Sequence, residues 1–319
     1  MAIELAPILL FVYNRPDQTR KTLEALADNS LADQSQLFIY ADGPKRGTDT
    51  AGLQKIEGVR NVIAERQWCK HVTIIKANSN KGLANSIIDG VTEKINEYGK
   101  VIVLEDDLVT SKGFIKFMND ALDKYQSDEK VMQVSGHQFP LNIPPNHSSF
   151  FLPLTTSWGW ATWKRAWDHF DSDAKGYEIL KKNRSLAQRF DLNSVYPYSK
   201  MLVSQMEGKD IDSWAIRWYW AVFKENGISL FPDKSLVQNI GFGILATHTS
   251  GSDAFLISDF DKSYFISDLP KQPKIEEKNF YSLKQALYKS FYKSSSSILV
   301  KAKIGIKMGL IFLKFTLRN

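Results

Sequence analysis

Short apolar runs alternate with amphipathic segments over the first 135 residues of the chain. The runs are too short for buried helices and are typical of strands that are covered on both faces. The segments between them place apolar residues at helical spacing, as Ile87, Val91 and Ile95 illustrate. The predicted strands are residues 7–13, 37–41, 71–76 and 101–104, and the predicted helices are residues 18–27, 53–67, 83–98 and 112–124. This alternation predicts an α/β fold with a mostly parallel sheet and helices on both faces.

The pattern changes after residue 135, where aromatic clusters and longer irregular segments replace the regular alternation. The expected elements are a strand over 132–135, a largely helical segment over 166–192, a helix within 210–223, and a loop-rich segment over 236–250. Residues 250–280 have few core signals, so we expect them to wrap the surface. We predict one domain in two halves, 1–135 and 136–280, followed by a tail over 281–319.

Polar side chains follow each of the four predicted parallel strands. They are Asn14 and Arg15, then Asp42, then Asn80, Lys81 and Gly82, and finally Glu105, Asp106 and Asp107. Ligands of open α/β sheets bind outside the carboxyl ends of the strands. Four polar strand ends in one sheet therefore predict a binding site at that edge.

The acidic triplet Glu105-Asp106-Asp107 is the most distinctive of these strand ends. Adjacent carboxylates repel one another, and their desolvation is costly unless a cation lies among them. Oxygen ligands suit Mg²⁺ or Mn²⁺, which also bind phosphate oxygens. The triplet thus favours a metal–diphosphate site over the alternative of a solvated turn. Neither GxGxxG nor GxxxxGK[ST] follows the first strand, which argues against a dinucleotide fold or a P-loop.

Composition and charge narrow the class of protein. The chain of 319 residues is 43% hydrophobic and 24% charged, as in ordinary globular proteins, and its one cysteine, Cys69, excludes an internal disulfide. Its start lacks a basic segment, so we interpret it as a first strand rather than a signal peptide and expect a cytoplasmic protein. The net charge is +6, yet residues 281–319 hold eight basic residues and no acid, leaving −2 for the remainder. This distribution does not fit a nucleic-acid-binding surface.

The basic tail has an amphipathic pattern. Its cationic sector contains Lys289, Lys303, Lys307, Lys314 and Arg318, with apolar residues broadly opposite. This pattern predicts an interfacial helix on an anionic membrane surface, peripheral on the inner face of the cell membrane. Lysines interrupt every apolar stretch, so no membrane span is expected. The alternative is a helix that packs on the body or on a protein partner.

The ordered set of motifs resembles the nucleotide-sugar glycosyltransferases of the GT-A fold. It is most similar to the Golgi N-acetylglucosaminyltransferase that acts on α-mannosides and to related bacterial family-2-like transferases. The matching segments, within residues 7–250, are Asn14-Arg15 with the helix after it, Tyr40–Gly43, Glu105–Leu108, Ser157–Trp160, and Asp212–Trp214 with Arg217. The surroundings of residues 80–83 and the C-terminal region differ from the family pattern, so the resemblance covers the reaction class better than the substrate.

The resemblance implies roles for the donor and metal residues. Asp107 would be the direct ligand of Mn²⁺ or Mg²⁺, with Asp106 and Glu105 contacting ribose or metal-bound water. Asp42 would contact the uridine or, alternatively, cap a turn. Further donor contacts are expected from Asn14, Arg15, Lys81 and Gly82, and His248 is expected at the metal or diphosphate unless it is structural.

The resemblance also implies a catalytic base and an acceptor site. Asp212 is the expected general base, since apolar neighbours would raise its pKa, and Asp210 is the competing candidate. The residues expected to bind the acceptor are Trp158, Gly159, Trp160, Trp214 and Arg217. For any single Trp, a place in the core is the alternative.

Together these observations predict a metal-dependent, inverting glycosyltransferase that moves a hexosyl or N-acetylhexosaminyl group. The donor would be a nucleotide sugar, most simply UDP-linked, and the acceptor a glycan or lipid-linked glycan in surface polysaccharide synthesis. One alternative is a nucleotidyltransferase, although Asn14-Arg15-Pro16 is not the glycine-rich basic loop expected after its first strand. The other is a non-catalytic carbohydrate-binding protein at the membrane.

Overall fold

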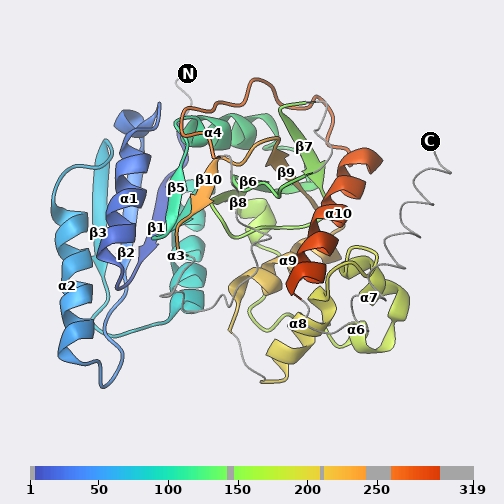
Figure 1. Ribbon diagram of the computed structural model, residues 1–319, viewed down its shortest axis with the longest axis horizontal. Coiled ribbons are helices and arrows are strands. Elements are labelled where there is room, and N and C mark those ends of the chain that lie inside the picture. The colour runs from blue at the N-terminus through green and yellow to red at the C-terminus, as the bar shows by residue number, and fades with distance from the viewer. Residues whose placement is uncertain (1–3, 142–146, 209–211, 242–259, 295–319) are drawn as a thin grey trace.

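The fold is described by a computed structural model that covers residues 4–141, 147–208, 212–241 and 260–294. Within these residues an eight-stranded sheet has the order β3-β2-β1-β4-β8-β6-β9-β7 (Figure 1). Its strands are β1 (Ile8–Val12), β2 (Gln36–Ala41), β3 (His71–Lys76), β4 (Lys100–Glu105), β6 (Val131–Ser135), β7 (Ser149–Leu152), β8 (Trp160–Trp163) and β9 (Ile228–Pro232). A small second sheet pairs β5 (Leu108–Thr110) with β10 (Val237–Asn239).

The first half of the chain forms the parallel part of the sheet, as predicted. Strand β1 pairs in parallel with both β2 and β4, and β2 pairs in parallel with β3. The intervening helices are α1 (Pro16–Ala27), α2 (Thr50–Ala64), α3 (Leu83–Tyr98) and α4 (Phe114–Lys124). The four predicted strands and four predicted helices are therefore confirmed, with differences of a few residues at their ends.

Side chains of the sheet alternate between two helical layers, which confirms an α/β fold with helices on both faces. In β1, Ile8, Leu10 and Val12 pack with α1, α2 and α4, whereas Leu9 and Phe11 pack with α3 and with α9 (Trp214–Lys224). Because strand residues alternate in direction, a strand buried on both faces must be apolar at every position. The continuous apolar run Ile8–Val12 meets this requirement.

The second half makes the sheet mixed. Strand β8 lies antiparallel between β4 and β6, while β6 pairs in parallel with β9 and β9 pairs antiparallel with β7. The helical segment expected over 166–192 is instead divided into α5 (Lys164–Trp167), α6 (Ile179–Lys182) and α7 (Arg184–Phe190). Between α5 and α6, the carboxylate of Asp171 accepts the backbone N–H groups of Asp173 and Lys175. Such local bonds compete with helical hydrogen bonding.

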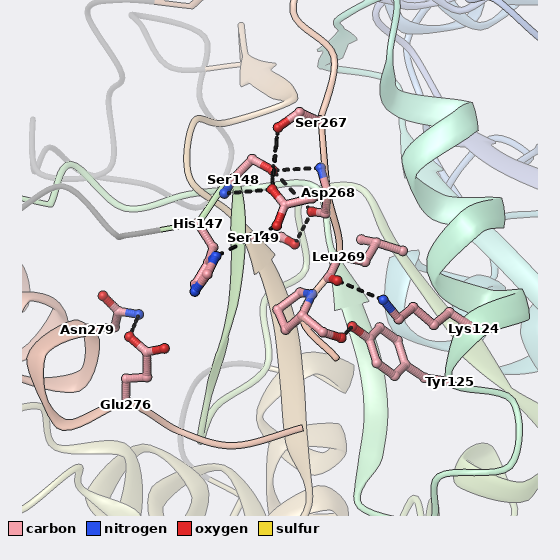
Figure 2. Close-up of polar contacts among 11 residues, drawn as sticks. Lys124, Tyr125, His147, Ser148, Ser149, Ser267, Asp268, Leu269, Glu276 and Asn279 are labelled. Atoms are coloured by element: carbon pink, nitrogen blue, oxygen red, sulfur yellow. Dashed lines mark hydrogen bonds and ion pairs between the residues drawn. The ribbon is translucent and has the colours of Figure 1, made fainter. Parts of the chain in front are cut away.

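Residues 260–276, which we call the strap, cross the surface, in agreement with the sequence prediction for this region. Asp268 fastens the strap to the start of β7 by bonds from Ser148 and Ser149 (Figure 2). Lys124, the last residue of α4, and Tyr125 after it donate to the carbonyl oxygens of Leu269 and Pro270. Further along, a bridge joins Ile275 to Phe151 in β7. The strap thus covers the outer edge of β7.

The last described helix corrects the predicted start of the tail. Helix α10 runs over Glu277–Ser294 and lies against β7 (Figure 1). Its side chains Leu283 and Leu287 are 0% and 1% exposed within a cluster that also contains Phe190 and Phe231. Leu283 and Leu287 are four residues apart and therefore share one apolar face of α10, which packs into the body. The predicted start of the tail, residue 281, lies within this buried helix and so belongs to the folded body.

Most of the predicted basic face lies outside the description. Residues 295–319 and the side chain of Lys289 are not among the described parts, so the structure does not test the interfacial helix. Among the described helices, none combines the length and apolar character that crossing a membrane requires.

Candidate functional site

The predicted strand ends meet at one edge of the sheet. Since β4 and β6 are both antiparallel to β8, they run in the same direction, and β1, β2, β3 and β9 run with them. The reversed strand β8 therefore begins at this edge, which places the preceding loop Ser157–Gly159 there. Helix α9 also begins at this edge, because Trp214 in its first turn stacks on Trp160 at the start of β8, with ring centroids 5.0 Å apart.

The acidic triplet forms the turn between β4 and β5. Arg15, at the start of α1, places its Nη1 atom 2.8 Å from the Asp107 carboxylate and 3.6 Å from that of Asp106. The Thr22 hydroxyl donates to the backbone carbonyl of Asp106. A single segment, α1 with the residue before it, therefore holds the triplet, and the Arg15 guanidinium contacts two of its three carboxylates.

Burial and mutual repulsion perturb the titration of the triplet. Burial raises the pKa of Glu105 to about 8, and the charges of Asp107 and Asp106 act in the same direction. Burial, with a contribution from Asp107, raises the pKa of Asp106 to about 7. Burial also raises the pKa of Asp107, although Arg15 opposes the shift. The site thus has a deficit of positive charge, which an added cation would relieve.

The donor set fits a hard divalent cation that is shared with a ligand. All three side chains offer carboxylate oxygens, the type that Mg²⁺ and Mn²⁺ prefer. No group of three His, Cys, Asp or Glu residues in the described part of the chain could hold a metal ion by itself. The protein's contribution would therefore be small, with Asp107 supplying a carboxylate and diphosphate oxygens and water completing the coordination.

Gly241 is a site residue that the sequence prediction missed. The chain after β10 returns to the triplet, where the Ile240 N–H donates to the Asp107 carbonyl over 2.8 Å. The Cβ of any larger residue at 241 would overlap the Asp107 carboxylate. Gly241 in the Gly-Phe-Gly sequence after a short strand was the available signal, since glycine often marks a close backbone approach.

Asp42 lies at the end of β2 and contacts the loop between β3 and α3. Its carboxylate accepts from the side chain of Asn80 and from the backbone N–H groups of Gly43, Lys81 and Gly82. Gly82 precedes α3 with φ of +80°, a conformation suited to glycine. The ammonium of Lys81 contacts the exposed Asp89 at 3.2 Å. The predicted donor residues of these two strands are thus brought together.

The predicted base is exposed rather than desolvated. The Asp212 side chain is 64% exposed, and its carboxylate lies 2.6 Å from the guanidinium of Arg217. The apolar sequence neighbours of Asp212 therefore do not bury it, so that part of the prediction is wrong. Arg217 is buried and donates to the carbonyls of Ser213 and Ser172 as well. Its guanidinium is directed at protein groups, which corrects its expected role in acceptor binding.

Two of the three expected acceptor tryptophans belong to the core. Trp160 is 0% exposed and Trp214 is 4% exposed, and each stacks on the other. A sugar cannot stack on a ring face that is already covered, so the acceptor roles predicted for these two rings are wrong. Trp158 is only partly buried and keeps accessible surface. Gly159 has φ of +61° and lies close to Val237, which ties the Trp158 loop to β10.

His137 is a second residue that the sequence prediction missed. It follows β6 and is 2% exposed, and neither ring nitrogen has a hydrogen-bond partner among the described residues. The rings of Trp158 and Phe139 contact it at centroid distances of 4.6 and 5.1 Å. Burial lowers the pKa of His137 to about 3. A lone histidine after a strand gives no sequence signal of such an environment.

Of the remaining predicted residues, Asn14 is partly exposed at the end of β1, on the same edge. The predicted ligand His248 and the competing base Asp210 lie outside the described residues.

No protein-family profile matches the sequence, and no curated protein matches it. The chain is similar to solved structures at low identity. S. aureus TarS 1–349 is 12% identical with a TM-score of 0.39, over 98% of this chain and 73% of that one. Mouse xyloside xylosyltransferase 1 is 11% identical with a TM-score of 0.36, over 68% and 81% of the two chains. UDP-glucose pyrophosphorylase in complex with UDP-glucose is 9% identical with a TM-score of 0.35, over 73% and 93%. Likenesses at this level carry no argument about function, so the proposal below rests on the site itself.

Proposed function

We propose that the protein is a metal-dependent, inverting glycosyltransferase with a nucleotide-sugar donor, most simply UDP-linked. The observation that carries the proposal is the largely buried acidic triplet at the carboxyl edge of an α/β sheet, where the Arg15 guanidinium contacts two of the three carboxylates. A divalent cation would supply the positive charge that the triplet lacks, and the diphosphate would supply oxygen ligands that the protein does not provide. The acceptor would be a glycan or lipid-linked glycan.

The residues at this edge of the sheet would have distinct roles in the transfer reaction. When bound, the metal neutralises negative charge on the departing diphosphate. Arg15, which lies beside Asp107, could donate two parallel hydrogen bonds to phosphate oxygens. Asp212 would accept the proton of the acceptor hydroxyl as that oxygen forms a bond to the sugar C1, while the bond from C1 to the diphosphate breaks. A single displacement of this kind inverts the configuration at C1.

Arg217 would position the base in this scheme. The guanidinium is held by two backbone carbonyls and contacts one carboxylate oxygen of Asp212 at 2.6 Å. Among the described residues, none forms an ion pair with the second carboxylate oxygen of Asp212. Exposure of Asp212 suits a base that must meet an acceptor arriving from solvent.

Calorimetric titration with UDP, in the presence and absence of Mn²⁺, tests the donor site. We expect binding that requires the metal and is lost in Asp107→Asn, whereas Glu65→Gln, a surface carboxylate paired with Arg20, should bind as the native chain does. UDP binding that is unchanged by metal and by Asp107→Asn would refute the proposal. A screen of nucleotide sugars for Mn²⁺-dependent hydrolysis would then identify the donor.

Asp212→Asn tests the catalytic assignment. We expect transfer to be abolished while UDP binding stays close to native, since Asp212 would act on the acceptor. Near-native turnover would reject Asp212 as the base. Formation of a nucleoside triphosphate from a sugar nucleotide and pyrophosphate would instead identify the nucleotidyltransferase alternative.

Attachment to an anionic membrane through the C-terminal segment is tested by a deletion that leaves the folded body intact. Because α10 is buried in the body as far as Tyr288, only residues 295–319 should be removed. We expect the native chain to sediment with anionic lipid vesicles and the shortened chain to remain in the supernatant. Equal sedimentation of both chains would contradict a peripheral attachment through this segment.

A further inference from the structure

The Asp42 carboxylate is fully engaged by protein donors. Oδ1 accepts from the N–H groups of Gly43 and Lys81 at 2.8 and 2.9 Å. Oδ2 accepts from the Asn80 amide at 2.9 Å and from the Gly82 N–H at 3.1 Å. We call Asp42 with these four donors the Asp42 clamp. A carboxylate has about four acceptor positions, and the clamp fills them.

A second set of contacts joins the same two segments independently of the carboxylate. A Cβ at Gly43 would lie 2.6 Å from the backbone of Ser79, so the chain after β2 touches the chain after β3. The Asn80 N–H donates to the Pro44 carbonyl over 3.0 Å, and the Asn80 side chain also reaches the carbonyl of Gly43. The ends of two neighbouring strands are therefore held together at their backbones.

We infer that Asp42 is a positioning residue, which holds the loop before α3 against the end of β2 and makes no base-specific contact with the nucleotide. The inference rests on the proposed nucleotide-sugar site, and it replaces the uridine contact that the family resemblance implied. A base N–H could reach Asp42 only by displacing one of its present donors. The displaced donor would lose a hydrogen bond to a charged acceptor, and this loss would offset the gain.

The inference predicts a distinctive pattern of affinities. Uracil presents a donor at N3 where cytosine presents an acceptor, so a carboxylate that read this position would separate UDP from CDP. A clamp would instead support both nucleotides equally. Asp42→Asn should therefore weaken Mn²⁺-dependent binding of UDP and CDP by the same factor, roughly tenfold for loss of a charge-assisted network.

Two further variants separate the clamp from a direct contact. Asn80→Ala removes one clamp donor and leaves residue 42 unchanged. It should weaken the binding of UDP and of CDP by one common factor. Its effect should be less than additive with that of Asp42→Asn, because the two residues belong to one network. Asp49→Asn is the matched control: it removes another carboxylate of the segment after β2, one that accepts the Gly52 N–H at the start of α2. It should leave both affinities unchanged.

Hydrogen exchange without nucleotide provides a readout that does not depend on the proposed function. Asp42→Asn should accelerate exchange at the amides of Gly43, Lys81 and Gly82, whereas Asp49→Asn should not. Native-like exchange at these amides, or a change of about tenfold in the ratio of UDP to CDP affinity, would overturn the inference. If the native chain binds no nucleotide, the proposed function fails, and the exchange rates still decide whether the clamp exists.

Discussion

Replacing Glu105 by Gln tests whether the acidic triplet is strained in the absence of metal. The pKa of Glu105 rises from its ordinary value of 4.5 to about 8 on folding, chiefly through burial. The folded chain therefore binds more protons than the unfolded chain between these pH values, and the stability of the native protein must fall as pH rises through this range. Glutamine keeps the shape of the side chain and removes the charge, so the variant should escape this loss.

The size of the effect follows from the same shift. Each unit of pKa difference corresponds to about 1.4 kcal/mol. Integrated over pH, the penalty from Glu105 grows by about 2 kcal/mol between pH 6 and pH 8, because the group is largely protonated in the folded state over much of this interval. The stability advantage of Glu105→Gln over the native chain should increase by that amount.

Urea unfolding at pH 6 and pH 8, with chelator present, measures this difference directly. Glu65→Gln is the control, because that carboxylate is about half exposed on the surface and should change stability little at either pH. Saturating Mn²⁺ should shrink the advantage of Glu105→Gln at pH 8, since a bound cation favours the ionised triplet. An advantage that stays constant or decreases from pH 6 to pH 8 would refute the electrostatic account of the site.

Three further changes test the packing around the site. His137→Phe should make the stability of the protein less sensitive to acid. The pKa of His137 is about 3 in the folded chain, below the ordinary 6.5, so the native protein loses stability as pH falls below 6.5, by roughly 1.4 kcal/mol per pH unit. Urea unfolding that shows the same dependence of stability on pH for the variant and the native chain would contradict this. Gly43→Ala should destabilise by about 1–3 kcal/mol because its Cβ meets the Ser79 backbone, while Gly58→Ala within α2 should be neutral or slightly stabilising in the same assay. Leu283→Ala should lower the free energy of unfolding in urea by about 2–4 kcal/mol, because α10 belongs to the core. An unchanged urea midpoint would show that α10 is part of the tail instead.

The parallel half of the fold was predictable because its sequence is locally consistent. Ile8–Val12 and Val101–Leu104 are continuous apolar runs, and the helices between the strands carry apolar residues at helical spacing. Because the carboxyl ends of parallel strands lie at one edge of the sheet, the polar residues that follow these strands come together there. The meeting of Arg15 with Asp107 therefore follows from topology, although the two residues are 92 positions apart.

The parts that escaped prediction depend on contacts between distant segments. The burial of Trp160 and Trp214 follows from the stacking of α9 on the start of β8, which composition does not reveal. The exposure of Asp212 was missed because its sequence neighbours are apolar. Two apolar neighbours bury a side chain only when the backbone turns that side chain inward. Gly241 meets Asp107 only because β10 pairs with β5.

The strap also has a consequence for the way in which the chain reaches its native state. Strand β7 is the last strand of the sheet, and the segment that bridges it lies more than a hundred residues later in the sequence. During synthesis, β7 therefore leaves the ribosome long before its cover exists. Until the strap is made, β7 offers an unpaired edge on which another nascent chain could add a strand. Chains truncated before residue 260 should accordingly aggregate as they are translated, even though they retain the whole acidic triplet.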